Sequence, residues 1–188
     1  HFLSNRLISN TAGLQLQISR SMGEGWSDFL ALLQTLRPND ATRPGNANWR
    51  GAFGVGGFAV GGVDGLGAPM EHHWFAIRRA PYSVDTEKNG FTFRHIRDGA
   101  SLPPGAFPNG APNSEVHGAG EVWCSMLWEG FVGMLRTTPD FERTRTAMLE
   151  TLVAGFKATP ANPDFLEARD ALLAVAFATD PARGELRP

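Results

Sequence analysis

The sequence predicts a mainly α-helical domain with an irregular middle region. Apolar residues recur every three or four positions near the start of the chain and again over residues 119–179, which is the pattern of helices that bury one face. Between them, residues 38–118 are rich in Gly and Pro and follow neither a helical nor a strand period. A length of 188 residues suits one domain, so we expect residues 1–188 to form a single unit.

The first two helices are predicted from their apolar stripes. One covers about residues 25–36 and ends before Pro38, because proline cannot continue a helix. The other covers about residues 120–136. The stripes consist of Trp26, Phe29, Leu30, Leu32, Leu33 and Leu36 in the first helix, and of Val122, Trp123, Met126, Leu127, Phe131 and Met134 in the second. We expect the helix tryptophans, Trp26, Trp123 and Trp128, to belong to the core.

The last two helices are predicted from their starts. Thr138-Pro139-Asp140 offers an N-cap followed by proline at the first helical position, and it opens a helix to about residue 156. Asn162-Pro163-Asp164 repeats this arrangement and opens a helix to about residue 178. We interpret the likeness as shared capping chemistry and not as a sequence repeat.

The glycine-rich segment 51–62 suggests a phosphate-binding loop by composition but not by spacing. It contains no G-x-G-x-x-G pattern, and neither lysine of the chain, Lys88 or Lys157, stands where such a loop needs one. We therefore expect a turn beside packed aromatic side chains. For residues 74–77, a short strand and a turn of buried helix both remain open.

Composition argues against several classes of function. A net charge of -2 leaves no surplus for binding a polyanion, so we expect no nucleic-acid partner. No apolar run reaches the roughly 18 residues that a membrane span needs, so we expect no membrane partner either. Cys124 is the only cysteine and cannot form an internal disulfide; we expect it to pack as a small apolar residue.

Few residues could carry chemistry. Glu24 and Asp28 are four positions apart and share a face of the predicted helix. Ser21-x-x-Glu24 also fits a capping box, in which a glutamate near the helix start needs no metal ion. From these residues alone, a helix cap and a functional site both remain open.

The histidines away from Glu24 have simpler explanations. His72-His73 beside Glu71 could form a second metal site, or a surface or packed pair. His95 lies in a polar stretch, and we expect it to be structural.

Five blocks resemble, in order along the chain, the signatures of fungalysin-type zinc metallopeptidases. Residues 1–7 resemble the segment that follows His-Glu-x-x in that family's zinc motif. Met22-Gly-Glu-Gly-Trp-Ser-Asp-Phe29 is similar to its second signature. The other three blocks are Ile77-Arg-Arg-Ala-Pro-Tyr-Ser83, Val116-His-Gly-Ala-Gly-Glu-Val-Trp123 and Asn162-Pro-Asp-Phe-Leu-Glu-Ala-Arg-Asp170. The blocks span nearly the whole chain.

The resemblance implies a fold and a set of residue roles. The fold is the helical C-terminal lobe of a thermolysin-like zinc peptidase, which is secreted, made as a zymogen and paired with a β-rich lobe across the substrate cleft. His1 and Glu24 match two zinc ligands, and Asp28 matches an acid that orients a ligand imidazole. His117 resembles the histidine that stabilises the oxyanion of the transition state. Tyr82, the only tyrosine, lies in a family-like block, and we expect it to bind substrate.

The implied activity is zinc-dependent endopeptidase activity on a protein or peptide substrate. Three protein ligands leave one zinc position for water, whose pKa the metal lowers to about 7. A glutamate beside the first histidine takes the proton, and a positioned imidazole meets the oxyanion.

The resemblance also implies that this chain carries only part of the site. It begins at His1, the second histidine of the motif, so we expect the first zinc histidine and the general base outside it. We expect the N-terminal part of the same peptidase as a partner, and this chain alone to be inactive. Cleavage before His1, a separate lobe and a sequence that covers part of the peptidase all remain open. The alternative is a helical binding or scaffold module that kept the signature and lost catalysis.

Overall fold

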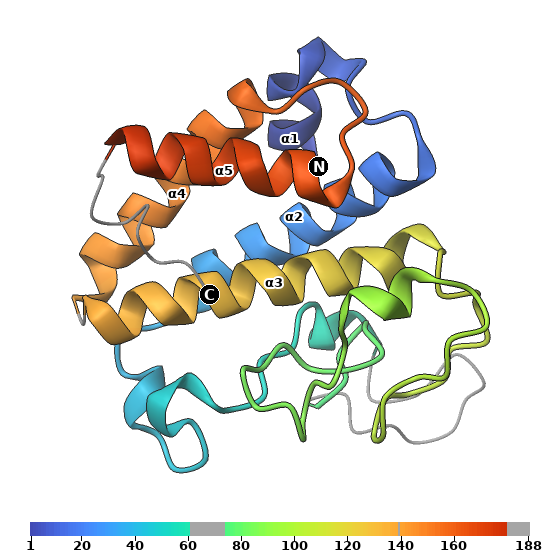
Figure 1. Ribbon diagram of the computed structural model, residues 1–188. Helices are drawn as coiled ribbons and strands as arrows, with labels where there is room; N and C mark the ends of the chain where they lie inside the picture. Colours follow the sequence, from blue (N-terminus) through green and yellow to red (C-terminus); the bar gives the residue numbers. More distant parts are fainter. Residues whose placement is uncertain (61–73, 139, 180–188) are drawn as a thin grey trace.

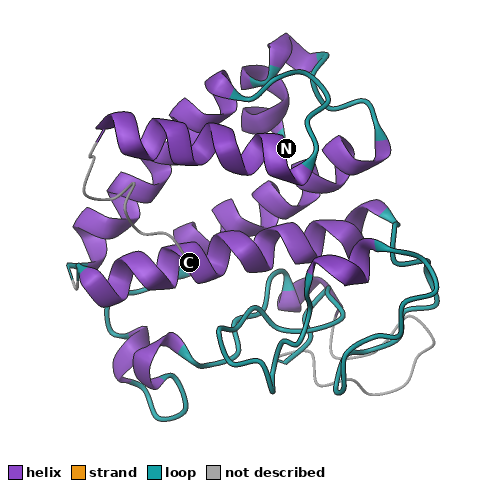
Figure 2. Ribbon diagram, viewed as in Figure 1, coloured by secondary structure: helices purple, strands orange, loops and turns teal. Residues whose placement is uncertain are grey.

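The computed structural model describes residues 1–60, 74–138 and 140–179, and it contains five α-helices (Figure 1). These are α1 (Phe2–Leu7), α2 (Gln17–Thr35), α3 (Val116–Thr137), α4 (Phe141–Ala158) and α5 (Phe165–Thr179). Short 3-10 turns occur at Ser9–Thr11, Asp40–Thr42, Ala47–Trp49, Gly57–Val60 and Phe93–Ile96. The described ranges contain no strand (Figure 2). An isolated antiparallel bridge joins Phe53 to Tyr82. The predicted mainly α fold with an irregular middle region is confirmed.

Helices α2 and α3 pack along each other in the middle of the molecule. In Figure 1, α4 and α5 lie on one side of α3 and the irregular segment lies on the other. The two helices meet where Gly25 of α2 faces Gly120 of α3. A Cβ atom on Gly25 would collide with the carbonyl oxygen of Gly120, and one on Gly120 would lie 2.7 Å from the carbonyl oxygen of Ser21. Only glycine allows the backbones to approach this closely.

Aromatic side chains fill the space between this pair and the last two helices. Trp26 packs edge-on against Trp123, with 5.6 Å between ring centroids, and against Phe156, with 5.1 Å. Trp123 also contacts Phe165 at 5.0 Å. These four side chains and Trp128 are almost fully buried, so the core role predicted for the tryptophans is confirmed.

Two helices begin earlier than the sequence predicts. α3 begins at Val116 and not near residue 120. α2 begins at Gln17 and not near residue 25, because its start is capped from elsewhere in the chain. The backbone N–H of Leu16 donates to Ser19 Oγ (3.1 Å) and to Asn162 Oδ1 (3.2 Å), 146 positions away. The Ser19 contact is local, but the Asn162 partner is too distant in sequence for a local motif to indicate it.

The starts of α4 and α5 are predicted at nearly the right places but with the wrong caps. Asp140, and not Thr138, caps α4, since its Oδ1 accepts from the backbone N–H of Arg143 (3.1 Å). At α5, Asp164 Oδ1 accepts from the N–H of Glu167 (2.9 Å), and Glu167 Oε2 accepts from the N–H of Asp164 (2.9 Å). This is a reciprocal capping box, so the aspartate after each proline does the capping.

Two consecutive arginines hold the irregular segment against the helix pair. Arg78 reaches Asp28 of α2, and Arg79 reaches Glu121 of α3. The preceding residues 74–77 form turns, so neither the strand nor the helix considered for them is present. Of the glycine-rich segment, residues 51–60 are described, and there Phe53 packs against Trp49 as expected for a turn beside aromatic side chains.

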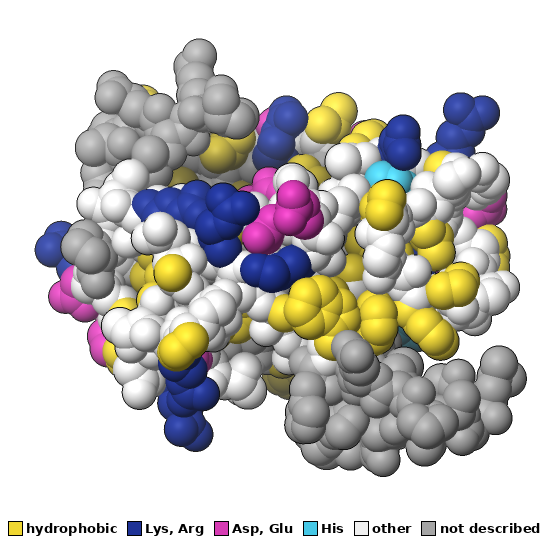
Figure 3. Space-filling view, turned by 90° about the horizontal axis from the view of Figure 1, so that it is seen from below, with side chains coloured by type: hydrophobic (Ala, Val, Ile, Leu, Met, Phe, Trp, Pro, Cys, Tyr) yellow, Lys and Arg dark blue, Asp and Glu magenta, His cyan; other side chains and the backbone are white. Residues whose placement is uncertain are grey.

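The surface carries mixed charge. On the face shown in Figure 3, Lys and Arg side chains lie among Asp and Glu side chains. Asp85, for example, pairs with both Arg50 (3.3 Å) and Lys88 (3.2 Å). Within the described ranges, no helix is both long and apolar enough to cross a membrane.

The glycine contact between α2 and α3 yields a paired prediction. Gly120→Ala should lower the free energy of unfolding by about 1–3 kcal/mol, because the added methyl group meets backbone atoms of α2. Gly130→Ala is the matched control on the same helix. Its added methyl group meets nothing within 4 Å, so the higher helix propensity of alanine should stabilise the protein by about 0.5–1 kcal/mol. Urea denaturation of the two variants measures both effects, and equal effects of the two substitutions would contradict the packing argument.

Candidate active site

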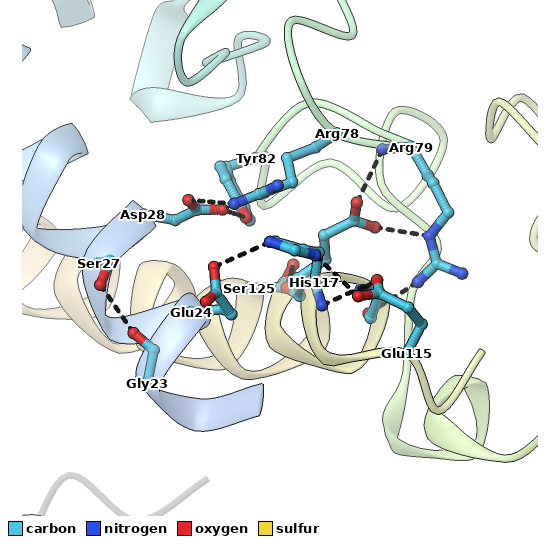
Figure 4. A network of polar contacts seen from close by, with 12 residues as sticks. Gly23, Glu24, Ser27, Asp28, Arg78, Arg79, Tyr82, Glu115, His117 and Ser125 are labelled. Atoms are coloured by element: carbon cyan, nitrogen blue, oxygen red, sulfur yellow. Dashed lines mark hydrogen bonds and ion pairs between the residues drawn. The ribbon is translucent and has the colours of Figure 1, made fainter. Parts of the chain in front are cut away.

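Glu24 lies between two imidazole groups. Its Oε2 atom is 3.6 Å from Nε2 of His1 and 3.3 Å from Nε2 of His117; Figure 4 shows the second contact. His1 precedes α1, and His117 lies in the first turn of α3, so three distant segments meet here. The capping interpretation of Glu24 is wrong, because α2 begins at Gln17 and Glu24 is the eighth residue of the helix.

The His1 ring makes a second contact with α2. Its Nδ1 atom lies 3.1 Å from Ser27 Oγ, and the Ser27 hydroxyl also donates to the carbonyl oxygen of Gly23 at 2.8 Å. The two ring nitrogens of His1 therefore face two residues of the same helix, Ser27 and Glu24.

The His117 ring is held by the residue that caps its helix. Glu115 Oε2 accepts hydrogen bonds from the backbone N–H groups of His117 (3.0 Å) and Gly118 (3.2 Å), and Glu115 Oε1 lies 2.8 Å from His117 Nδ1. Burial alone would raise the pKa of Glu115, but its hydrogen bonds with His117 and Gly118 outweigh this effect and lower it. A carboxylate at this distance keeps a proton on Nδ1 and turns Nε2 toward Glu24.

Asp28 belongs to a buried cluster beside this group. Arg78 donates to it through Nε (2.6 Å to Oδ2) and Nη2 (2.7 Å to Oδ1), and the Tyr82 hydroxyl donates to Oδ2 (Figure 4). Burial would lower the pKa of Arg78, but the hydrogen bonds and charge of Asp28 raise it above its ordinary value. Burial, with the nearby Cys124 and Asp28, raises the pKa of Tyr82, so its phenol keeps its proton.

A second buried cluster fixes the start of α3. Arg79 donates through its backbone N–H and Nε to Glu121 (2.9 Å each), through Nη1 to Asn113 (3.0 Å) and through Nη2 to the carbonyl oxygen of Gly118 (2.7 Å). Burial raises the pKa of Glu121, and the charge and hydrogen bonds of Arg79 oppose that rise. The arginine thereby fixes the helical turn that carries His117.

Comparisons with known proteins decide the family. The sequence profile of the fungalysin metallopeptidases matches residues 1–182. The chain belongs to the fungalysin family of metallopeptidases. It is 30% identical to extracellular metalloproteinase 1 of Trichophyton equinum, over 92% of this chain and 25% of that protein. It is 28% identical to extracellular metalloproteinase 3 of Arthroderma otae at the same coverage. The chain thus spans about a quarter of the length of these curated relatives.

The fold brings together most of the site residues that the fungalysin resemblance predicts. His1, Glu24 and His117 meet, and Asp28 follows Glu24 by one turn of α2. Tyr82 does not fit the substrate-binding role predicted for it. Its side chain is 1% exposed, and its hydroxyl is engaged by Asp28, so it supports that carboxylate instead.

The predictions for His95 and Cys124 are confirmed, and that for the His72-His73 pair is not tested. His95 is structural as predicted: it is buried, and its Nδ1 accepts from the backbone N–H of Thr92 (2.8 Å). Cys124 is buried among apolar side chains as predicted, and burial raises the pKa of its thiol. Glu71, His72 and His73 lie outside the described residues, so the choice between a surface or packed pair and a second metal site stays open.

Sequence reasoning missed four residues that contact the predicted site residues or the helix turn that carries them. Glu115 orients His117, Ser27 contacts His1, and Arg78 and Arg79 fix Asp28 and the start of α3. An acid one residue before an apolar helix is a recognisable N-cap signal that could have identified Glu115. The partners of the two arginines are far away in sequence, and no local pattern could have identified them.

The Glu115 contacts predict a pH-dependent stability. A carboxyl whose pKa is lowered on folding stabilises the protein above its ordinary value of 4.5, and this contribution is lost as the pH falls through the folded-state value. Glu115→Gln should therefore lower the free energy of unfolding at pH 7 by about 0.3–1 kcal/mol, and the difference from wild type should shrink below pH 4.5.

The control for this measurement is Glu129→Gln on the same helix. Burial raises the pKa of Glu129, so its negative charge at pH 7 opposes folding, whereas that of Glu115 favours it. Removing the Glu129 charge should therefore not lower the free energy of unfolding at pH 7. Thermal denaturation from pH 3 to pH 7 tests both variants. If the stability difference between Glu115→Gln and wild type stays constant over this range, the charge of Glu115 does not contribute to stability.

Proposed function

We propose that this chain forms part of the active site of a secreted, zinc-dependent endopeptidase that hydrolyses protein or peptide substrates. Membership of a metallopeptidase family supports the reaction class, and the relatives' name, extracellular metalloproteinase, supports secretion. The observation that carries the proposal is the Glu24 carboxylate facing the Nε2 atoms of His1 and His117.

The donor atoms of His1 and Glu24 fit a zinc ion. Imidazole nitrogen and carboxylate oxygen lie about 2.0–2.2 Å from zinc, so two tetrahedral ligands are roughly 3.3 Å apart. His1 Nε2 and Glu24 Oε2 are 3.6 Å apart, close to that separation. Bound zinc would polarise the substrate carbonyl and lower the pKa of a water molecule.

Two ligands are fewer than such a site uses. In the described part of the chain, no three His, Cys, Asp or Glu side chains are grouped so as to hold a metal ion. We propose that the third ligand and the general base come from the N-terminal part of the same peptidase, which would also make this chain inactive alone. The family's His-Glu-x-x-His motif supports this, since His1 matches its last residue.

His117 would act on the substrate and not on the metal. Its ring is about half exposed, with Nδ1–H held by Glu115 and Nε2 turned toward Glu24. With hydrogens on both ring nitrogens, the ring would donate Nε2–H to the oxygen of the peptide carbonyl as negative charge develops there. Because Glu115 fixes the ring beforehand, no reorganisation is needed during the reaction.

Asp28 would orient the imidazole of the missing ligand. A carboxylate can accept about four hydrogen bonds, and Arg78 and Tyr82 donate three to Asp28. One acceptor position remains for the N–H of a ligand histidine, and no described histidine occupies it. Metal-bound imidazoles usually donate their second N–H to such a partner.

The first test concerns the metal ligand. Glu24→Gln in the natural-length protein should weaken zinc binding by more than about 100-fold, because it removes a ligand and not only a supporting group. Helical circular dichroism should be unchanged, since Glu24 is inside α2 and caps nothing. Glu150→Gln, an exposed glutamate of α4, is the control and should keep full zinc. If Glu24→Gln retains one zinc per chain, the ligand set is wrong.

The second test concerns His117. His117→Ala should keep its zinc and change its melting temperature only a little, because Glu115 loses one side-chain contact but still caps α3 through the backbone. Its kcat should fall by about 10²–10³, the usual cost of one lost oxyanion donor. Zinc content, melting temperature and kcat are measured on one preparation. Loss of zinc would make His117 a ligand, and an unchanged kcat would refute its catalytic role. A natural-length wild-type protein without peptidase activity would favour the inactive scaffold module.

A further inference from the structure

We infer that Ser27 is a positioning residue for the metal site, because its hydroxyl oxygen accepts the Nδ1–H of His1 and thereby points the His1 Nε2 lone pair toward Glu24. This inference rests on the proposed function. Its geometric basis is the 3.1 Å separation of Ser27 Oγ and His1 Nδ1.

The hydroxyl proton of Ser27 decides which group donates. A serine hydroxyl has one proton and two acceptor lone pairs. Ser27 lies 2.8 Å from the carbonyl oxygen of Gly23 one turn earlier, which can only accept. With its proton committed there, Ser27 Oγ can serve His1 only as an acceptor, so Nδ1 carries the hydrogen. The other nitrogen, Nε2, is then the unprotonated atom that a metal ion requires.

The rigid helix makes this arrangement specific. Ser27 and Glu24 are three positions apart on α2, so their side chains share one helix face. One face of one helix therefore contacts both nitrogens of the His1 ring, with Ser27 at Nδ1 and Glu24 at Nε2. A flip of the ring would put carbon atoms in place of both nitrogens and lose both contacts. The donor atom therefore stays aligned with the carboxylate that would share the metal.

Asp28, the other polar group nearby, does not take this role toward His1. Its oxygens accept hydrogen bonds from Arg78 and Tyr82, and within the described ranges these two are its side-chain hydrogen-bond partners. Ser27, which precedes Asp28 in the sequence, is the residue whose side chain contacts His1 Nδ1.

A second serine of α2 supplies a matched control. The Ser21 hydroxyl donates to the carbonyl oxygen of Gln17 at 2.9 Å, the same bond to the preceding turn that Ser27 makes. Ser21 is buried in α2 one turn before the site, and no histidine contact to its side chain is present among the described residues. Ser21→Ala therefore removes the same kind of helix bond without touching a ligand.

The experiment compares Ser27→Ala, Ser27→Thr and Ser21→Ala in the natural-length protein. Zinc affinity is measured by competition with a chelator, and thermal stability of the zinc-free protein is measured in parallel. Ser27→Ala should bind zinc roughly 10–100-fold more weakly than wild type, the usual effect of losing a hydrogen-bond partner of a metal ligand. Ser27→Thr keeps the hydroxyl and should restore the affinity to within a few-fold, and Ser21→Ala should leave it unchanged.

The zinc affinities of the three variants either support or overturn the positioning role of Ser27. Weak zinc binding by Ser27→Ala together with rescue by Ser27→Thr supports the inference, whatever the small changes in stability. Wild-type affinity in Ser27→Ala, or equal weakening in Ser21→Ala or in Ser27→Thr, overturns it and leaves the proposed function intact. A wild-type protein that binds no zinc overturns the proposed function itself, and the inference with it.

Discussion

The backbones of α2 and α3 meet where Gly25 faces Gly120, and the site depends on this contact. A Cβ atom on Gly120 would lie 2.9 Å from the Cβ of Glu24, so this close approach includes the residue that carries the carboxylate. His117 is less than one turn before Gly120 on α3. The short crossing distance is what places its ring 3.3 Å from Glu24. A wider crossing would leave both side chains in place on their helices but out of contact.

Buried ion pairs determine how the irregular segment lies on this helix pair. Arg78 and Arg79 are adjacent, and they point to different helices, one to Asp28 and the other to Glu121. Breaking a buried pair by removing one partner costs about 3–5 kcal/mol, although the intact pair contributes little net stability. The two pairs therefore specify the register of the segment more than they stabilise the fold. Through Gly118, Arg79 also fixes the turn that carries His117.

Periodicity and local motifs predicted four of the five described helices but not α1, and they could not show contacts between residues distant in sequence. The apolar stripes identified the cores of α2 and α3 but placed both starts too late. The start of α2 depends partly on the distant Asn162, whereas that of α3 depends on Glu115, a local cap that the stripe alone does not show. The same limit applies at the site. Sequence resemblance indicated His1, Glu24 and His117, and the structure brings them together. It could not show that Tyr82 is buried against Asp28, because burial depends on the packing of the whole irregular segment.

Anomalous diffraction at the zinc absorption edge, from crystals of the natural-length protein, tests the central claim most directly. The account predicts one anomalous peak about 2.0–2.2 Å from His1 Nε2 and from a Glu24 carboxylate oxygen, the ordinary zinc–ligand distances. His117 should lie outside this bonding distance, with Nδ1 still on Glu115. A peak bonded to His117 Nε2, or no peak between His1 and Glu24, would contradict the account.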